Sequence, residues 1–412
     1  MIIVVGGGPA GMMAAIRAGY SNREIILIDK NFYLGRKLLL TGGGRCNLTN
    51  TCSTEELIGH FSKTGNFLRD AFKAFASKEL LSFFEERGLK FKVEKNGCVF
   101  TIDNKASSVR DILANELKKL NVKILFNQEV QKLLIDKEKK VVLGAALTSG
   151  NAVLGEHVIL ATGGVSYKET GSTGDGIRMA EEIGHKIVPL RPGLSALNVE
   201  ENYPKLLEGL SFEKARLTFT ALNKKIFSKE GTLLFTGTGI SGPATLALSA
   251  KIADALAEDK KIKLQIDFLP DMDFNTAEKY LIRAFNNAKR KNVKNILKSF
   301  VPERLADTIL ELSNIFHGKD SNIITVEERK KILSFLKNFT FSISKDVPFD
   351  KAQITRGGVS IKDIDPKTME SKKIKGLYFA GEMIDIDAEC GGFNLQGAFS
   401  TGFLAGKSAA TN

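Results

Sequence analysis

The chain has 412 residues, 43% of them hydrophobic, which is enough for two or three domains with large cores. Lysine and arginine exceed aspartate and glutamate by 59 − 47 = 12, an excess that suits anionic cofactors or substrates as well as nucleic acid. Four cysteines in so long a chain exclude a disulfide framework, and no apolar run approaches the roughly 20 residues that a membrane-spanning helix needs. The apolar start lacks the basic residues of a secretory signal, so we expect a cytoplasmic protein without a membrane span.

Charged and metal-ligating residues give no strong signal of their own. The densest basic stretch, residues 289–298, lies in a helical pattern and is typical of a solvated face, so we do not expect a nucleic-acid partner. The four histidines are far apart in sequence, and we expect no metal site. A small-molecule substrate is the expected partner, and the sequence leaves the oligomeric state open.

The first 30 residues have the pattern of a βαβ unit. Residues 1–6 form an apolar run typical of a strand, residues 9–20 predict a helix, and residues 24–29 (EIILID) predict a second strand. A glycine-rich loop follows at residues 35–50.

Helices and strands then alternate up to residue 184. Asn96-Gly97 is a typical turn of a β-hairpin. The remaining elements predicted here are helices at 66–77, 78–87, 107–120 and 174–184, and strands near 122–126, 129–135, 141–148 and 154–161.

The pattern changes at residues 189–193 (PLRPG). Residues 194–268 are β-rich with short turns, and residues 275–340 have apolar residues at helical spacing. After Phe339 the strand signal returns, and a second glycine-rich stretch at 376–406 ends in a small-residue helix. The chain is therefore expected to leave one domain near residue 190 and to return to it near residue 350.

Gly6-Gly7-Gly8-Pro9-Ala10-Gly11 matches G-x-G-x-x-G between the first strand and the first helix. In such a loop Gly6 permits the tight turn, Gly8 lets a pyrophosphate approach the backbone, and Gly11 lets helix and strand pack closely. The helix N-terminus then faces the pyrophosphate with its partial positive charge. Asp29, which ends the second strand, is placed to accept hydrogen bonds from ribose hydroxyls. The context predicts a dinucleotide site but does not separate FAD from NAD.

Glycines next to polar donors elsewhere in the chain favour a flavin. Residues 41–50 (TGGGRCNLTN) follow soon after Asp29 and suit a backbone pressed against a flat ring system. Residues 376–382 (GLYFAGE) read as an apolar strand that ends in Gly-Glu, and residues 391–398 (GGFNLQGA) open the final helix. A helix N-terminus at that place can stabilise negative charge on a reduced flavin. We therefore expect non-covalently bound FAD.

These segments carry a family resemblance. The chain resembles the bacterial aminoacetone-oxidase-like flavoproteins, often labelled BaiN-like NAD(P)/FAD-dependent oxidoreductases, over nearly its whole length. The most specific matches are GRKLLLTGGGRCNLTN (35–50), ATGGVSYKETGSTGDG (161–176) and GLYFAGEMIDIDAECGGFNLQGA (376–398). The second of these is also similar to segments of fumarate-reductase-type flavoproteins.

The resemblance implies an α/β fold: a Rossmann-like FAD-binding domain built from both chain ends, with an inserted β-rich domain and a small helical domain. The implied ranges are 1–189 and 350–412 for the FAD-binding domain, 190–274 and 341–349 for the β-rich insert, and 275–340 for the helical domain.

The resemblance also implies which residues meet FAD. Gly6, Gly8, Ala10 and Gly11, with Thr162 and Gly163, would line the pyrophosphate; Asp29, Lys30 and Val130 the adenosine end; Arg36, Thr41, Gly43, Cys46 and Asn47 the flavin half; Gly381, Glu382 and Asp385 the ribityl chain; and Asn394, Leu395 and Gln396 the isoalloxazine.

Two positions depart from the family pattern. Family members usually have a His where this chain has Gly237, and an aromatic residue, often Trp, where it has Gly397. Substrate identity is therefore not carried over, and no catalytic residue is assigned. Tyr167, Lys168, Arg356 and Glu389 are candidates for substrate contact, although a surface loop position is the favoured interpretation of Lys168.

Gly237-Thr238-Gly239-Ile240-Ser241-Gly242 is a second match to G-x-G-x-x-G. It lacks following βα units, so we interpret it as a structural turn in preference to an NAD(P) site. Cys390 lies beside the expected flavin segment but has no partner cysteine nearby in sequence, which favours a plain thiol over a redox centre.

The leading hypothesis is an FAD-dependent oxidoreductase that transfers hydride between flavin and a small organic substrate, with NAD(P)H as a donor that docks transiently. An amine oxidase that uses oxygen, of the aminoacetone type, is one alternative. A flavin-containing protein that binds or modifies RNA, or that senses redox state, is another.

Overall fold

The computed structural model describes residues 1–61, 63–222, 224–288, 291–345, 349 and 352–411. The chain forms two compact units, Met1–Gly193 with Phe349–Asn412 (unit 1) and Leu194–Pro348 (unit 2). Unit 1 thus joins the two ends of the sequence. The predicted separation of unit 2 into a β-rich and a helical domain stays a prediction.

Unit 1 is centred on a parallel sheet of five strands in the order β19-β10-β1-β2-β6. Ile2 of β1 lies opposite both Ile25 of β2 and His157 of β10. Each of the three inner strands is buried along its whole length, as expected where both faces of a parallel sheet are covered. The strands are β1 (Ile2–Val5), β2 (Ile25–Ile28), β6 (Lys123–Leu125), β10 (His157–Leu160) and β19 (Leu377–Phe379).

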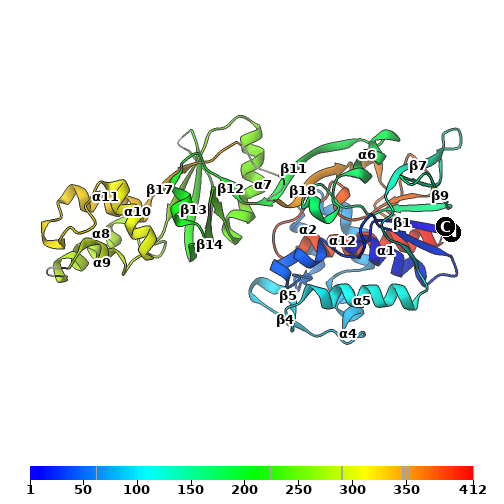
Figure 1. Cartoon of the computed structure of the whole chain (residues 1–412), viewed down its shortest axis with the longest axis horizontal. Helices are drawn as coiled ribbons and strands as arrows, with labels where there is room; N and C mark the ends of the chain where they lie inside the picture. The colour runs from blue at the N-terminus through cyan, green and yellow to red at the C-terminus, as the bar shows by residue number, and fades with distance from the viewer. Residues whose placement is uncertain (62, 223, 289–290, 346–348, 350–351, 412) are drawn as a thin grey trace. The chain divides into compact units, whose positions relative to one another are not determined.

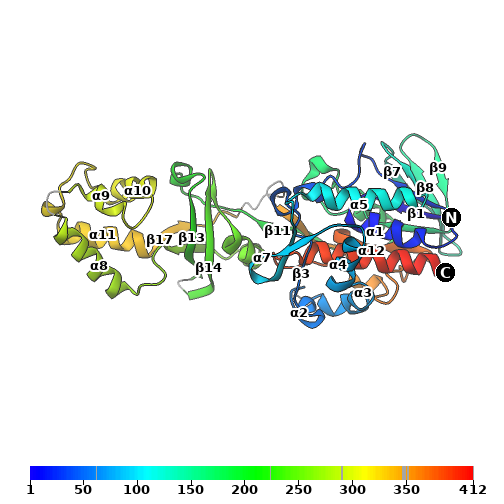
Figure 2. The same ribbon diagram turned by 90° about the horizontal axis from the view of Figure 1, so that it is seen from below.

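Helix α1 (Pro9–Gly19) lies side by side with helix α12 (Phe393–Thr411), and Figures 1 and 2 both show this pair. The contact depends on two glycines of α12. A Cβ on Gly402 or Gly406 would collide with the carbonyl oxygen of Ala10 or Ala14, respectively. The last helix of the chain therefore packs backbone to backbone on the first. Figure 2 shows the two termini at the same end of this unit.

The other elements of unit 1 surround this sheet. Two small antiparallel sheets have the orders β3-β5-β4 and β7-β8-β9, and β11 pairs with β18. Their bounds are β3 (Thr49–Asn50), β4 (Phe91–Val93), β5 (Cys98–Thr101), β7 (Val130–Asp136), β8 (Val141–Leu147), β9 (Ala152–Leu154), β11 (Ile187–Ser195) and β18 (Ala352–Val359). The helices are α2 (Thr54–Gly59), α3 (Arg69–Ala74), α4 (Ser77–Glu85), α5 (Ala106–Lys119) and α6 (Asp175–Glu182).

Unit 2 contains a sheet of six strands in the order β12-β15-β14-β13-β16-β17. The pairings reported for this sheet are antiparallel. The strands are β12 (Leu197–Asn198), β13 (Ser211–Ala221), β14 (Lys224–Thr236), β15 (Gly239–Ser241), β16 (Ile262–Asp267) and β17 (Phe339–Ser342). The helices are α7 (Pro243–Ala257), α8 (Phe274–Asn287), α9 (Val293–Leu297), α10 (Glu303–Ser313) and α11 (Val326–Lys337).

The sequence patterns located most of these elements. The hairpin across Asn96-Gly97 is confirmed as β4 and β5. The helix predicted over 66–77 is shorter in the structure, because α3 ends at Ala74 and α4 begins at Ser77. Helix α2 was not predicted, although Ser53 and Glu56 form a capping box at its start, a pattern that is readable in sequence.

Candidate functional site

The loop between β1 and α1 has the geometry that a phosphate-binding turn needs. Gly6 has φ +106°, and a Cβ there would collide with the backbone of Ala161. A Cβ on Gly11 would collide with the carbonyl oxygen of Gly6. Gly8 differs, because no protein atom lies within 4 Å of the Cβ position built on it. Two of the glycines are thus required by packing, whereas Gly8 faces open space at the start of α1.

Gly8 is also the N-cap residue of α1, and no side chain caps that helix end. Pro9 occupies the first turn, where its missing N–H has no cost. The positive end of the helix dipole therefore faces the space in front of Gly8, an arrangement that favours a pyrophosphate. This open space is the observation that makes the loop fit the FAD pyrophosphate.

The Asp29 carboxylate ties the glycine loop to the segment after β2. Its Oδ2 accepts from the Gly7 N–H at 2.6 Å, and its Oδ1 accepts from the backbone and side-chain amides of Asn31 at 2.7 and 2.9 Å. Asp29 is 9% exposed and reaches the cavity wall, where Oδ2 still has a lone pair for a ribose hydroxyl. The carboxylate therefore shapes the loop in addition to the expected ribose contact.

Lys30 and Arg36 connect neighbouring parts of the cavity. The Lys30 Nζ lies 2.6 Å from Oδ2 of Asp175, at the start of α6. The ammonium lowers the pKa of Asp175, against the effect of burial, which raises it. The Arg36 guanidinium donates to Oδ1 of Asn31 at 2.7 Å and lies 5.7 Å from the ring centroid of Tyr33. Both cations therefore have protein partners in the cavity wall, Lys30 at the predicted adenosine end and Arg36 in the predicted flavin half.

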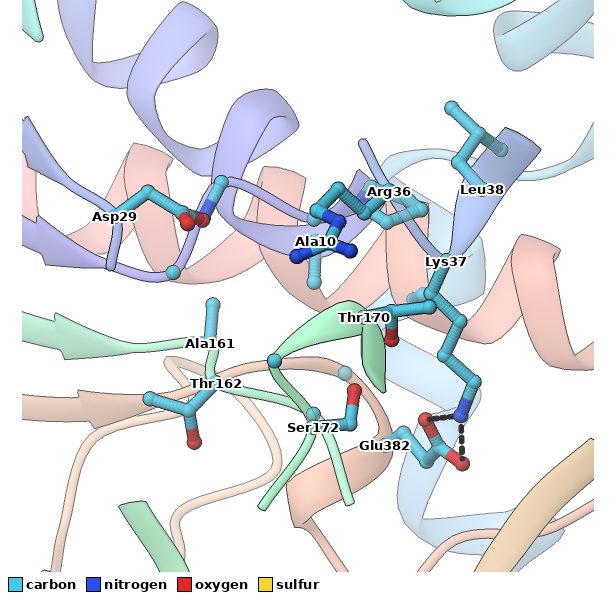
Figure 3. Close-up of a pocket in the computed structure, with 18 of the residues that line it drawn as sticks. Ala10, Asp29, Arg36, Lys37, Leu38, Ala161, Thr162, Thr170, Ser172 and Glu382 are labelled. Carbon is cyan, nitrogen blue, oxygen red and sulfur yellow. Dashed lines mark hydrogen bonds and ion pairs between the residues drawn. The ribbon is translucent and has the colours of Figure 1, made fainter. Parts of the chain in front are cut away.

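Lys37 and Glu382 form an ion pair inside the cavity (Figure 3). The Lys37 Nζ lies 2.8 and 2.7 Å from the two carboxylate oxygens of Glu382 and 2.6 Å from the Ser166 hydroxyl. Glu382 also accepts from the backbone N–H of Thr355 at 2.7 Å. The ion pair therefore links the loop after β2, the segment after β10 and the C-terminal segment.

The start of α12 contributes Asn394 and Leu395 to the cavity wall. The Asn394 side chain exchanges two hydrogen bonds with the backbone of Ala388, at 2.9 and 3.0 Å. Gln396, the next predicted residue, is fully buried and bonds Thr49 at 2.6 Å and the carbonyl oxygen of Phe75 at 3.1 Å. Gln396 therefore joins the start of α12 to the segments that contain Thr49 and Phe75, outside the cavity wall.

A cavity in unit 1 brings most of the predicted cofactor residues together (Figure 3). Its wall includes Gly6, Gly8, Ala10, Asp29, Lys30, Arg36, Thr41, Val130, Thr162, Gly163, Gly381, Glu382, Asn394 and Leu395. Outside the wall lie Gly11, Gly43, Cys46, Asn47, Asp385 and Gln396.

Three of the predicted residues outside the wall, Cys46, Asn47 and Asp385, are buried or hydrogen-bonded within the protein. Cys46 is buried, which raises its pKa from 9.0 to about 12. Asn47, with its amide oriented to satisfy both neighbours, donates to the Thr49 carbonyl and accepts from the Gly392 N–H. Burial raises the pKa of Asp385; the Asp387 carboxylate adds to the shift and Arg356 opposes it. Cys46 is therefore buried and Asn47 is hydrogen-bonded within the protein, and the contacts expected between these residues and FAD stay predictions.

Several wall residues were not predicted. They include Lys37, Phe61, Gln128, Glu129, Thr170, Ser172, Asp175 and Gln353. Lys37 and Asp175 lie inside the glycine-rich segments 35–50 and 161–176, and this context is the sequence feature from which they could have been predicted. Phe61 follows a short unpredicted helix, and its position had no such signal.

Phe61 lies next to Gly397, the position at which the resemblance leads us to expect an aromatic residue. A Cβ on Gly397 would lie 2.9 Å from the Phe61 ring, which is 1% exposed. This chain thus places an aromatic ring from another segment against the position at which the family usually has an aromatic side chain. The ring belongs to the cavity wall.

The second glycine motif lies in antiparallel surroundings in unit 2. Residues Gly239–Ser241 form β15, which pairs with β12 and β14. A Cβ on Gly239 would collide with the carbonyl oxygen of Leu197 on the neighbouring strand. These glycines serve strand packing and the start of α7, as the interpretation as a structural turn predicts.

The described part of the chain was searched for metal sites and for membrane-spanning helices. Within those residues no group of three or more His, Cys, Asp or Glu side chains could hold a metal ion. No helix among them is long and apolar enough to cross a membrane.

Comparison with known proteins places the whole chain in one group. The family model for the HI0933-like protein Rossmann domain matches residues 1–408. The 3-dehydro-bile acid delta(4,6)-reductase of Clostridium scindens is 31% identical over 410 residues, covering 99% of this chain and 98% of the relative. The ribosomal RNA dihydrouridine synthase of Escherichia coli is 30% identical over 402 residues, covering 97% and 95%.

Solved structures share the fold at lower identity. A 3-ketosteroid delta1-dehydrogenase from Sterolibacterium denitrificans has a TM-score of 0.55 at 13% identity and covers 100% of this chain and 99% of that one. The FrdA subunit of E. coli quinol fumarate reductase has a TM-score of 0.52 at 20% identity, with 100% and 69% covered.

The parallel sheet, the open glycine turn and the cavity between both chain ends define a Rossmann-type FAD-dependent oxidoreductase. Within that class, the chain belongs to the HI0933-like family, which confirms the expected BaiN-like resemblance. The expectations of an enzyme and of FAD as cofactor are confirmed with it.

Proposed function

We propose that this flavoprotein is an NAD(P)H-linked reductase that adds hydrogen across a C=C bond conjugated to a carbonyl group of a small organic substrate. The observation that carries the proposal is the pair of full-length relatives. One name denotes reduction at delta(4,6) of a 3-dehydro compound, and the other denotes formation of dihydrouridine, which is uridine with two hydrogens added across a ring C=C. Hydrogen addition to C=C bonds near a carbonyl is the chemistry that the two names share.

The cavity residues divide into three roles in this proposal. Gly8 and the N-terminus of α1 would hold the pyrophosphate, and Glu129 and Val130, which also line the cavity, would lie beside the adenosine end. The Lys37–Glu382 ion pair would fix the central part of FAD, and the start of α12 would supply a positive dipole end for the ring. Bound FAD supplies the hydride acceptor and donor at N5. The protein supplies position and electrostatics.

We further propose that the nicotinamide donor docks transiently, without a Rossmann domain of its own. The second glycine motif lies on β15, whose pairings with β12 and β14 are antiparallel, whereas a Rossmann-type nucleotide site is built on parallel strands. The excess of 12 positive charges would attract a phosphate-bearing donor. Reduction requires only that the nicotinamide stack near N5.

Stopped-flow absorbance of the purified flavoprotein without oxygen tests the donor. Bleaching of the flavin band by NADH or NADPH, followed by reoxidation with an α,β-unsaturated ketone, is the expected result. Rapid bleaching by an amine with peroxide release in air, and no bleaching by either nicotinamide, would establish the amine oxidase instead. Bleaching without steady-state turnover of any acceptor would favour a redox sensor.

A second candidate is reduction of uracil rings in RNA. It is favoured by the names of the E. coli relative and of a Haemophilus influenzae relative, also a ribosomal RNA dihydrouridine synthase and 30% identical over 405 residues. The positive net charge is compatible with it. Reoxidation of the reduced flavin by ribosomal RNA, and not by a small enone, would select this candidate over the first.

A further inference from the structure

The six-stranded sheet of unit 2 has two unlike faces. Leu217 and Phe219 of β13, with Leu264 of β16 and Phe341 of β17, are fully buried in a core on one face. Side chains alternate along a strand, so the residues between them point to the other face. Those residues are half-buried or exposed. One face of the sheet is therefore covered and the other is open.

The open face is polar in successive cross-strand rows. One row is Thr340, Gln265, Thr218 and Ser228, and the next is Ser342, Lys263, Thr220 and Lys225. The Thr218 and Ser228 hydroxyls lie 3.2 Å apart across β13 and β14. We call these eight residues the open face. It presents hydroxyl, amide and ammonium groups, without a carboxylate among them.

Positive charge collects at one end of this face. Lys225 and Lys263 flank Thr220 on the two neighbouring strands, and Lys224 and Lys261 lie beside them. In the part of the chain that the structure describes, none of these four lysines has a carboxylate within ion-pair distance, and all four are exposed. Their charge is therefore available to a partner.

At the other end of the sheet the charge is neutralised. Arg216, in the row beyond Thr218, lies 2.6 Å from Glu230 and 3.7 Å from Asp267. Lys214 is paired with Asp271. The two ends of the sheet therefore differ in charge: cations are paired with carboxylates at one end, and the four exposed lysines lie at the other.

We propose that the open face docks single-stranded RNA through its phosphate and ribose groups. Phosphates are the chemical match for unpaired lysines on a polar surface. The hydroxyls and the amide between the lysines suit the ribose 2′-OH, the group by which a protein distinguishes RNA from DNA. The open face has no aromatic side chain for base stacking, so docking is independent of sequence.

This inference deepens the second candidate function and rests on it for its biological meaning. Docking is measured by binding alone, however, and turnover is measured separately. RNA that binds the open face without oxidising the reduced flavin would refute the RNA candidate and leave the docking surface intact. Turnover of RNA with no contribution from the open face would do the reverse.

The test uses the full-length flavoprotein and fluorescence anisotropy of a labelled single-stranded RNA at several salt concentrations. The double variant Lys225→Gln/Lys263→Gln should weaken RNA binding by about tenfold and reduce the slope of log K against log salt by about 1.4, which is about 0.7 for each lost phosphate contact. The matched control is Lys330→Gln/Lys331→Gln, which removes the same charge from an exposed part of α11. The control should bind as the unmodified protein does.

Thr220→Val tests the ribose contact without changing the charge. It should lower the affinity ratio between RNA and DNA of the same sequence and leave the salt slope unchanged. Equal loss in the lysine variant and in the control would overturn the proposal, because net charge would then explain binding. Equal affinity for RNA and DNA, or binding of polyglutamate with the same loss in the lysine variant, would also overturn it. Flavin content and far-UV circular dichroism verify that each variant is folded.

Discussion

The Lys37 ammonium lies within 2.8 Å of both carboxylate oxygens of Glu382, a residue 345 positions later in the chain. Both side chains are about one-fifth exposed, so water screens the pair only in part. The Ser166 hydroxyl and the Thr355 N–H complete the contacts of Glu382. The two chain ends are thus joined by an ion pair in the wall of the predicted FAD site.

Removing both members of this pair should cost less than the sum of the two single losses. Lys37→Met leaves the Glu382 carboxylate without its cation and should lower the free energy of unfolding by about 1–3 kcal/mol. In the double variant Lys37→Met/Glu382→Gln, about 1 kcal/mol or more of the summed single losses should be recovered. Urea unfolding followed by flavin fluorescence measures the unmodified protein, Lys37→Met, Glu382→Gln and the double variant. Lys407→Met, on the exposed surface of α12, is the control. Strictly additive losses would contradict the coupling.

Gly8→Val should remove FAD and leave the fold. Its φ of −79° suits any residue, and no protein atom lies within 4 Å of the Cβ position. The added side chain enters the space assigned to the pyrophosphate. The flavin-to-protein absorbance ratio should fall at least about tenfold, as expected when a bulky group blocks a phosphate cradle. Circular dichroism should be nearly unchanged.

The matched control for that variant is Gly11→Val, which collides with the Gly6 backbone inside the protein. It should yield little folded protein. Normal flavin occupancy in Gly8→Val would exclude this loop as the pyrophosphate site.

Cys46 should be unreactive in the folded protein. Burial raises the pKa of its thiol to about 12, so about one molecule in 10,000 carries the thiolate at pH 8. A thiol-specific reagent such as DTNB should modify the exposed Cys390 first and reach Cys46 only after unfolding. Mass spectrometry of digested, partly labelled protein identifies the order. Early modification of Cys46 would place it on an accessible surface.

His185 should make unit 1 sensitive to acid. Burial lowers its pKa below 6.5, and its Nε2 lies 2.7 Å from the Ser371 hydroxyl. The unfolded chain therefore takes up a proton at a higher pH than the folded protein does. The stabilising contribution is full above pH 6.5 and falls as the pH drops below it.

His185→Gln should lower stability at pH 8 and flatten its dependence on pH between 8 and 5.5. Urea unfolding at several pH values measures both effects. A variant whose stability falls as steeply with acid as that of the unmodified protein would show that another group is responsible. His157, whose pKa is also lowered by burial, serves as the comparison.

The local patterns of the sequence were sufficient for the parallel core and the phosphate loop. Apolar runs such as IIVV and IILI, separated by a helix with glycines at its start, have one consistent arrangement. The contacts of Lys37 and Gln396 could not be predicted in the same way, because each depends on segments more than 300 residues apart. Gln396 is fully buried outside the cavity wall, and its expected contact with the isoalloxazine stays a prediction, since helix phase at a glycine-rich start is not fixed by pattern alone.

The open face of unit 2 shows a different limit. Its polar rows exist only once the register of β13, β14 and β16 is set, and a one-residue shift would exchange the faces. The lysines concerned stand in two short groups, Lys224 with Lys225 and Lys261 with Lys263, and nothing in the sequence shows that these groups lie side by side. Within the densest basic stretch, Lys294 and Lys298 contact Glu303, and Lys294 also contacts Asp307.

Strand β19 and helix α12 have a consequence for synthesis of the protein. The ribosome makes β1 first, but the edge strand that pairs with β10 and the helix that packs on α1 emerge last. Until then, the nascent sheet has an open edge and an uncovered apolar helix face, which are features that chaperones bind. Unit 2 is continuous in sequence and can complete its own sheet before the C-terminal residues are made. Translation arrest shortly before residue 377 should therefore yield chains with a folded middle and an aggregation-prone start.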